Sequence, residues 1–536
     1  MIGNKEYNEK LYVSFQLSQK VPENNFYRRL KGILDLRFIT RQTKHYYGTE
    51  GQKSIDPEVF FKLMLVGYLE NINSDRRIIE HASMRLDILF FIGYDIDEPL
   101  PWHSTLSRTR NLYGEEVFLS LFRKVLSMCI DRGMVSGKRQ AIDSAFIKAN
   151  ASMDSLVEKE VVECSQDYLD ELNENDDDNN DHNENKPIVT TQKKKQVEQH
   201  HAWKKKAYKD MPGTSVKENT SLDDNGNTIR PKFLSNHTHY SPTDSDARIA
   251  VKPGKPRQLY YSGQISVDTS SHVICGAMAN FADRRDSQSL PAILTQTIDN
   301  LKPYEINILE ALADTGYSSG DALRLLEFYR ITGYIPNFGQ FKPVREGFTY
   351  DPEKDCYTCS QGVLLPYKKT HTDAKGNIKK AYRSSRIHCK ACYLRSKCIG
   401  KSFEKTIEDC IDKPYYDKMR ERMQTRKAKI MKNLRSSTVE PVLGTLINFM
   451  NMKRVNTRGI ELASKHVLLA ATVYNLKKYM NTVQRGARAA AIKALKVNSS
   501  PILTLILVRF AQLIEFLCLN EKNIKFSIPL IIKVNY

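Results

Sequence analysis

The chain has 536 residues, of which 41% are hydrophobic and 27% are charged, and this composition excludes a collagen-like or wholly disordered protein. Its 81 lysine and arginine residues exceed its 62 aspartate and glutamate residues, giving a formal net charge of +19. An excess of this size favours a polyanionic partner, most often nucleic acid, over the alternative of a merely basic surface.

The ends of the chain predict neither export nor a membrane partner. Residues 1–15 lack a basic start followed by an apolar run and a cleavage site. The most apolar stretch, residues 502–519, is interrupted by Arg509, Gln512 and Glu515, so we expect a buried or amphipathic helix there. We therefore expect a cytoplasmic protein. Its ten cysteines do not indicate a disulfide framework, and five of them lie between residues 356 and 398, which indicates metal binding.

Residues 1–135 are predicted to form an N-terminal helical DNA-binding domain. Asp56 and Pro57 are typical of a helix start, and a second helix is predicted to begin at Ser74. Ser104 is expected to cap a third, short helix that carries Arg108 and Arg110 as candidate DNA contacts. Short helices around the proline-rich break at residues 99–101 fit a helix-turn-helix, but they fit an ordinary helical bundle with a basic face equally well.

The middle of the chain predicts an α/β fold, with a mixed sheet and flanking helices. Residues 136–154 hold a strand that carries Asp143, and within residues 236–340 the apolar strand 306–313 ends at Asp314. Between these two parts, residues 155–235 are first acidic and then basic. This low-complexity insertion is expected to lie outside the fold, because such charge runs repel themselves.

Residues 341–431 are predicted to form a small cysteine-rich insertion. Its two Cys-x-x-Cys pairs suit one structural Zn²⁺, and because we expect the segment to have little core of its own, metal binding would supply its folding energy. The alternative is a set of reduced, unliganded cysteines in a small β insert. The predicted ligands are Cys356, Cys359, Cys389 and Cys392, with Cys398 as an alternative ligand.

Two helical segments complete the predicted organisation of the chain. Residues 432–484 contain core helices, and Glu440 is expected at the start of the first of them. A break in this region is expected near residues 456–459. Residues 485–536 form a tail that is basic and then apolar.

Asp143, Asp314 and Glu440 are the candidate catalytic residues. Each of the two aspartates follows an apolar strand, and α/β sheets place functional groups at such strand ends. Three carboxylates from separate elements are hard oxygen ligands that suit two Mg²⁺ or Mn²⁺ ions. Two such ions can activate water and stabilise the leaving oxygen in phosphodiester cleavage. The alternative is that these acids are ordinary caps and turn formers.

The residues around these acids resemble the three acidic motifs of DDE transposases from bacterial insertion sequences. The motifs are Ala141–Ser144, Leu312–Tyr317 and Val439–Gly444, and the helical region before them and the cysteine cluster between the second and third also follow the order found in that family. The resemblance implies an RNase H-like fold and Mg²⁺-dependent DNA strand cleavage and transfer. It further implies terminal inverted repeats and target DNA as partners, and a homodimer or larger assembly on DNA.

The sequence departs from the family near Glu440. Related transposases often carry an arginine four residues before the glutamate and a lysine after it, whereas here Arg435 lies one residue further away and Ile447 stands at the lysine position. Arg435, Lys453 and Arg454 are therefore the candidate phosphate contacts. Two other functions stay open: a non-catalytic DNA-binding protein derived from a transposase, and a stand-alone Mg²⁺ nuclease.

Overall fold

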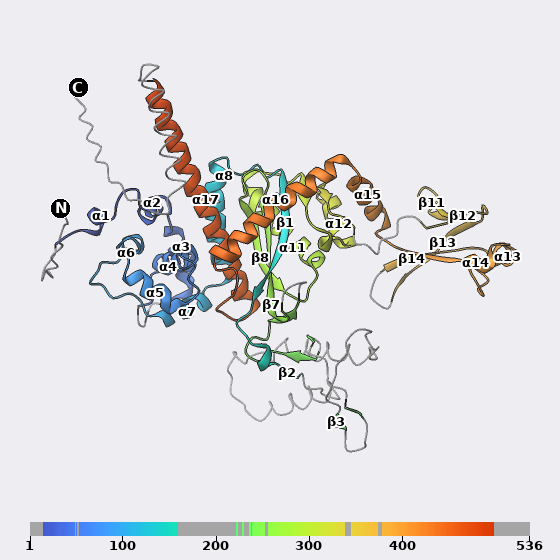
Figure 1. Ribbon diagram of the computed structural model, residues 1–536, viewed down its shortest axis with the longest axis horizontal. Helices are drawn as coiled ribbons and strands as arrows, with labels where there is room; N and C mark the ends of the chain where they lie inside the picture. The colour runs from blue at the N-terminus through green and yellow to red at the C-terminus, as the bar shows by residue number, and fades with distance from the viewer. Residues whose placement is uncertain are drawn as a thin grey trace, which may run out of the picture. The chain divides into compact units, whose positions relative to one another are not determined.

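The computed structural model of the protein is shown in Figure 1. It describes residues 14–48, 50, 53–158, 221–222, 228–229, 235–236, 238–251, 256–337, 345–373 and 378–497. The chain divides into two compact units, Met1–Asn475 and Leu476–Tyr536, and the boundary falls within the last described helix. The fold and the candidate site described below belong to the first unit.

Helices follow one another through the N-terminal part of the first unit. Asp56 accepts a hydrogen bond from the Glu58 amide at 2.7 Å and Ser74 lies at the next helix start, as predicted. The helix predicted to be capped by Ser104 begins instead at His103, after Trp102, so that cap prediction is wrong. The helices are α1 (Leu17–Lys20), α2 (Phe26–Ile33), α3 (Arg37–Thr43), η1 (Lys44–Tyr46), α4 (Pro57–Leu69), α5 (Asp75–Ser83), α6 (Leu86–Ile92), α7 (His103–Leu112) and α8 (Glu115–Asp131).

The arrangement of these helices is that of a bundle. Residues 93–102 separate α6 from α7, whereas the turn of a helix-turn-helix has about three or four residues. Helix α4 is buried almost all round, and α7 buries Leu106, Thr109 and Arg110. Of the two expectations for this region, the bundle is therefore the one that the structure favours.

The centre of the unit is a six-stranded mixed sheet, as predicted. Its order is β10-β9-β1-β7, and β7 pairs on its far side with both β8 and β6. Strands β1, β7 and β8 are antiparallel neighbours, while β9 runs parallel to β1 and β10 runs parallel to β9. The strands are β1 (Arg139–Lys148), β6 (Arg248–Ala250), β7 (Gln258–Asp268), β8 (Ile274–Phe281), β9 (Glu310–Leu312) and β10 (Thr332–Tyr334).

Helices cover both faces of this sheet. A Cβ atom on Gly276 of β8 would meet Thr297 of α11, whereas a Cβ on Gly263 of β7 would lie 3.4 Å from Val467 of α17. Gly276 pairs with Ser266, which is three residues from Gly263 and so points to the opposite face. Helix α16 contacts strands β1, β7, β9 and β10 of the same sheet. The sheet is thus the middle layer of the fold (Figure 1).

The helices around the sheet differ in one respect from the prediction. Helix α16 begins at Arg426, where the Thr425 hydroxyl accepts a hydrogen bond from the Ala428 amide, so Glu440 lies in the helix interior and not at its start. The expected break precedes Ile460. The elements are α11 (Asp286–Leu301), η3 (Lys302–Tyr304), η4 (Thr315–Tyr317), α12 (Gly320–Phe328), α15 (Lys413–Met423), α16 (Arg426–Phe449) and α17 (Ile460–Val497).

Short strands lie at the two ends of the predicted low-complexity insertion. β2 (Val157–Glu158) pairs with β5 (His239–Tyr240) after η2 (Met153–Ser155), and β3 (Ser221–Leu222) pairs with β4 (Thr228–Ile229). Most of residues 155–235, and the apolar stretch 502–519, lie outside the described residues. Among the described helices, none is long and apolar enough to cross a membrane.

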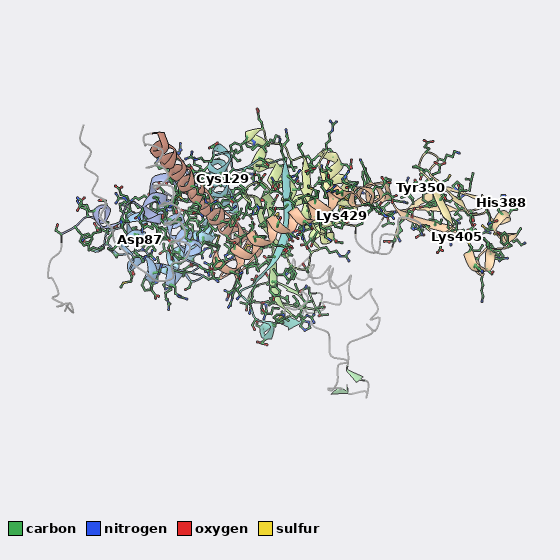
Figure 2. The ribbon with its side chains drawn as sticks, turned by 45° about the horizontal axis from the view of Figure 1, so that its top comes forward. Asp87, Cys129, Tyr350, His388, Lys405 and Lys429 are labelled. Carbon is green, nitrogen blue, oxygen red and sulfur yellow. The ribbon has the colours of Figure 1, made fainter. Side chains whose placement is uncertain are left out.

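The cysteine-rich insertion has a hydrophobic core of its own, contrary to expectation. Tyr357, Leu365, Tyr382 and Ile407 are almost fully buried against one another on a five-stranded antiparallel sheet. Figure 2 shows Tyr350 and His388 on this insertion. Its elements are β11 (Phe348–Asp351), β12 (Cys356–Cys359), β13 (Leu364–Thr372), β14 (Ile378–Arg383), α13 (Arg386–Lys390), α14 (Arg395–Cys398) and β15 (Thr406–Cys410).

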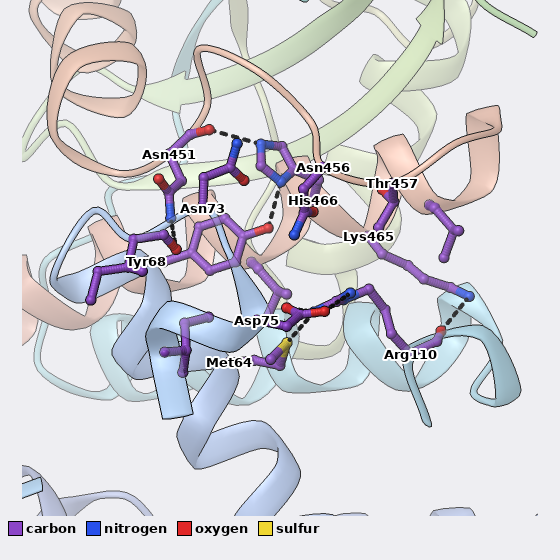
Figure 3. A pocket seen from close by; sticks show the side chains of 14 residues that line it. Met64, Tyr68, Asn73, Asp75, Arg110, Asn451, Asn456, Thr457, Lys465 and His466 are labelled. Carbon is purple, nitrogen blue, oxygen red and sulfur yellow. Dashed lines mark hydrogen bonds and ion pairs between the residues drawn. The ribbon is translucent and has the colours of Figure 1, made fainter. Parts of the chain in front are cut away.

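A buried polar cluster joins the N-terminal bundle to the start of α17. The Tyr68 hydroxyl lies 2.6 Å from Nδ1 of His466, and Nε2 of His466 lies 3.0 Å from the Asn451 carbonyl oxygen (Figure 3). Because a carbonyl can only accept, Nε2 carries the proton and Nδ1 accepts from the tyrosine hydroxyl. Asn451 in turn donates to the Gly67 carbonyl at 3.0 Å. These bonds fix the bundle on α17.

The stability of this junction should fall at acid pH. Burial lowers the pKa of His466 to about 4, against about 6.5 for an exposed histidine. Since the unfolded chain binds the proton more tightly, stability present above pH 6.5 is lost as the pH falls toward 4, by about 3 kcal/mol at most. Unfolding of wild type and His466→Gln in urea across this range measures the difference. Parallel pH profiles of the two proteins would contradict the assignment.

Candidate active site

Strand pairing brings Asp143 and Asp314 together. β1 and β9 are parallel, and Ala141 pairs with Leu312. Each aspartate lies two residues further along its own chain: Asp143 is still within β1, whereas Asp314 lies beyond the end of β9 and caps η4. Burial is the main cause of the raised pKa of Asp143, and the Asp314 charge adds to it. This register agrees with the predicted meeting of the two acids, which stays a prediction.

Asp143 is largely buried, and both of its carboxylate oxygens have partners. Oδ1 accepts a hydrogen bond from the Ser144 amide at 2.8 Å, and Oδ2 accepts one from Nη1 of Arg435 at 2.8 Å. Burial raises the pKa of Asp143, while the Ser144 amide and the Arg435 guanidinium oppose that rise. Asp314 is fixed similarly, because its Oδ1 accepts from the Gly316 amide at 2.9 Å.

Arg435 connects Glu440 to this pair. Its Nη2 lies 3.6 Å from Oε1 of Glu440, while its Nη1 is bound to Asp143. The Arg435 side chain is only 14% exposed, whereas that of Glu440 is 61% exposed. The structure thus places one guanidinium between the first and third predicted catalytic acids. Arg435 was predicted as a DNA contact, and in this arrangement its charge is directed to carboxylates.

A polar layer that sequence reasoning missed supports the Asp314 loop. The buried Tyr317 hydroxyl donates to Oε1 of Gln264 at 2.5 Å, and Nε2 of Gln264 donates to Oδ1 of Asp286 at 3.2 Å. Burial raises the pKa of Tyr317 far above its usual value, and the Asp286, Asp143 and Asp314 charges add to this effect. Asp286 is the first residue of α11. Its spacing from the other acids gave no signal that it would meet Gln264.

The described residues do not show the three acids as one group of metal ligands. Within the part of the chain that the structure describes, no three His, Cys, Asp or Glu side chains are grouped so that they could hold a metal ion. The convergence of Asp143, Asp314 and Glu440 within bridging distance therefore stays a prediction. The physical reason is visible at Asp143, where the position facing Glu440 is taken by the Arg435 guanidinium.

The chemistry of these three carboxylates nevertheless suits a divalent cation. Carboxylate oxygens are the ligands that Mg²⁺ and Mn²⁺ prefer. The site already attracts a positive charge, since Arg435 is a cation bound between Asp143 and Glu440. Asp143, Asp314 and Glu440 are therefore the residues that would hold such ions.

The other predicted DNA contacts differ in their exposure. Arg108, Lys453 and Arg454 are exposed. Arg110 is buried, and its guanidinium donates to the Asp75 carboxylate at 2.6 and 3.0 Å (Figure 3). A guanidinium enclosed in this way cannot reach DNA, so we assign Arg110 a structural role in place of the predicted one.

The cysteines do not lie as the zinc prediction requires. Cys356 and Cys359 are three residues apart within β12, and side chains at that spacing in a strand point to opposite faces. Cys359 packs against the cluster that contains Tyr357, whereas Cys356 is buried on the other side of the strand. Cys389 lies 3.0 Å from the Ser384 hydroxyl. This register argues against one ion shared by Cys356 and Cys359. The Zn²⁺ site predicted at Cys356, Cys359, Cys389 and Cys392, with Cys398 as an alternative ligand, stays a prediction.

The insertion should keep its fold when zinc is removed. Its aromatic core and its sheet, not a metal, supply the apolar burial that orders the segment. Hydrogen exchange of the β12–β14 amides, measured with and without a zinc chelator, should therefore give the same protection. Rapid exchange of these amides after chelation would show that metal binding supplies the folding energy.

Two acids near the site serve as caps. Oδ1 of Asp244 accepts from the Gly459 amide at 3.1 Å, and Oδ2 of Asp246 accepts from the Ile460 amide at 3.0 Å. Both carboxylates thus bind the N-terminus of α17, where the helix dipole favours negative charge. They do not belong to the group around Asp143.

A three-stranded antiparallel meander continued by two parallel strands, with acids on neighbouring strands, defines an RNase H-like domain. Two family models match the chain: a transposase domain (DUF772) over residues 15–112, and a transposase DDE domain over residues 358–480. Both matches support a DDE transposase. The second match includes Glu440, whereas Asp143 and Asp314 lie outside both matched ranges. No curated protein matches the chain.

Proposed function

We propose that this transposase cuts the ends of its insertion sequence and joins them to target DNA, using divalent ions held by Asp143, Asp314 and Glu440. The observation that carries the proposal is the placement of Asp143 and Asp314 just beyond the paired Ala141 and Leu312, with Arg435 bound to Asp143 and 3.6 Å from Glu440. Two Mg²⁺ ions bound there would activate a water molecule and neutralise the charge of the leaving oxygen.

The chain itself contributes a fixed negative site. The Ser144 amide orients Asp143 and the Gly316 amide orients Asp314, so neither carboxylate has to be ordered during the reaction. Glu440 lies on a long helix that packs against β1, and its exposed side chain can turn toward the two aspartates. This arrangement supports strand cleavage and strand transfer at one site, because both are displacements at phosphorus.

Exposed cations lie next to the end of β1, the strand that carries Asp143. The Lys148 amide at the end of β1 donates to the Lys453 carbonyl oxygen at 3.1 Å, and the Val455 amide donates back to the Lys148 carbonyl at 3.0 Å. Lys453 and Arg454 are therefore attached to the strand that carries Asp143. Phosphate contacts from such cations supply affinity that falls steeply with salt. They support DNA as the substrate.

The tip of the insertion, residues 383–405, has a composition that suits DNA. It contains seven lysine and arginine residues and one acidic residue, Glu404. Glu404 is bound by Arg383 at 3.1 Å and by Arg386 at 3.3 Å. Tyr393 is 78% exposed and Phe403 is 54% exposed. Exposed rings among cations bind nucleic acid by stacking and by phosphate contact, so we include this tip in the proposed DNA-binding surface.

The experiment uses the DNA that flanks the reading frame. Purified protein and this DNA should give Mg²⁺-dependent strand breaks at the ends of the element, followed by joining to a second DNA. Binding to the same ends without breaks would identify a non-catalytic DNA-binding protein derived from a transposase. Breaks independent of DNA sequence would identify a stand-alone nuclease. The proposal includes a homodimer or larger assembly, which sizing of the DNA complex measures.

A further inference from the structure

Arg435 holds the position that a metal ion would need. It is bound to Oδ2 of Asp143 at 2.8 Å and lies 3.6 Å from Glu440, with its side chain 14% exposed. We propose that Arg435 is an internal counterion that competes with divalent metal for Asp143, and that it must leave Oδ2 before metal binds there. This inference rests on the proposed function, because it assumes that Asp143 is a metal ligand.

The occupancy of the Asp143 oxygens leads to this competition. Oδ1 is engaged by the Ser144 amide, which is part of β1 and cannot move away without disturbing the sheet. Oδ2 is engaged by a side chain, which can rotate. Oδ2 is therefore the oxygen that an added metal ion can reach. The guanidinium bound there is positively charged, like the metal ion, so the two repel each other.

Arg435 also stabilises the charged form of Asp143. Asp143 and Asp314 repel each other, and burial of Asp143 adds a further cost to its charge. A bound guanidinium offsets both effects with charge-assisted hydrogen bonds. Once released from Asp143, the Arg435 guanidinium can bind the DNA of the proposed reaction, because a guanidinium pairs well with phosphate oxygens. Binding of DNA would then increase the affinity for metal, and binding of metal would increase the affinity for DNA.

The test is calorimetric titration of the full chain with Mn²⁺, without DNA and at mildly alkaline pH. Arg435→Gln removes the competing charge and should raise the Mn²⁺ affinity by roughly tenfold or more, because a hydrogen bond to a charged group has to be broken only in the wild type. Lys432→Gln is the matched control, since it removes an exposed cation from the same helix and should leave the affinity almost unchanged.

Each outcome decides the proposal. Equal or weaker Mn²⁺ binding by Arg435→Gln, or an equal gain in Lys432→Gln, would overturn the competition while leaving the metal site in place. No Mn²⁺ binding by either the wild type or Arg435→Gln would overturn the proposed function as well. Where circular dichroism shows Arg435→Gln to be unfolded, Arg435→Met, which also removes the charge, replaces it, and an unchanged affinity for that variant would also overturn the proposal.

Discussion

Replacing Asp143 by Asn should lower the rate of DNA strand cleavage by roughly a thousandfold or more. The change keeps the shape of the side chain but removes the negative charge that would hold a divalent ion, and the stabilisation such an ion gives to the transition state amounts to several kcal/mol. Single-turnover cleavage of end-containing DNA by the wild type and the variant measures the effect.

The same variant should bind DNA nearly as well as the wild type. The candidate contacts Arg108, Lys453 and Arg454 are exposed and are not altered by the change. DNA affinity measured in parallel therefore separates a lost catalytic group from a lost fold. Cleavage at the wild-type rate by folded Asp143→Asn would remove this residue from the active site.

Replacing Asp75 by Ala should destabilise the protein by about 3–5 kcal/mol. The Asp75 side chain is 14% exposed and the Arg110 side chain is 9% exposed, so the variant leaves a buried guanidinium without its carboxylate. Nη2 of Arg110 would keep only its weak contact to the Met64 sulfur at 3.1 Å. Chemical unfolding of the full chain, followed by circular dichroism, measures the change.

Arg108→Ala is the matched control for this prediction. Arg108 lies on the same helix but is exposed, so its loss should leave stability almost unchanged. Its effect should appear instead in DNA affinity. If Arg110→Ala weakened DNA binding without reducing stability, the structural role assigned to Arg110 would be wrong and the original DNA-contact prediction would be restored.

The strands that precede Asp143 and Asp314 could be predicted because local patterns determine them. An apolar strand that ends in an acid and small polar residues occurs at both positions, and parallel pairing of two such strands aligns the acids. The capped start of α4 at Asp56 and Pro57 is similarly local. These features depend on residues close together in the sequence, so short windows of sequence contain them.

Contacts between distant segments could not be predicted in this way. Arg110 pairs with Asp75 on another helix, and Arg435 pairs with an acid 292 positions earlier in the chain. The start of α16 was predicted near Glu440, whereas the helix begins at Arg426 and continues through Pro441. In the insertion, the Cys-x-x-Cys spacing suggested a metal knuckle, but β12 extends through the pair and separates the two side chains.

The central claim is that Asp143, Asp314 and Glu440 together hold divalent metal. Its most direct test is Mn²⁺ binding to the full chain, compared between the wild type and the single variants Asp314→Asn and Glu440→Gln, with Asp246→Asn as a control acid that caps α17. We predict that the wild type and the control bind Mn²⁺ and that each of the other two variants loses at least one bound ion. Equal binding by all four proteins would contradict the claim.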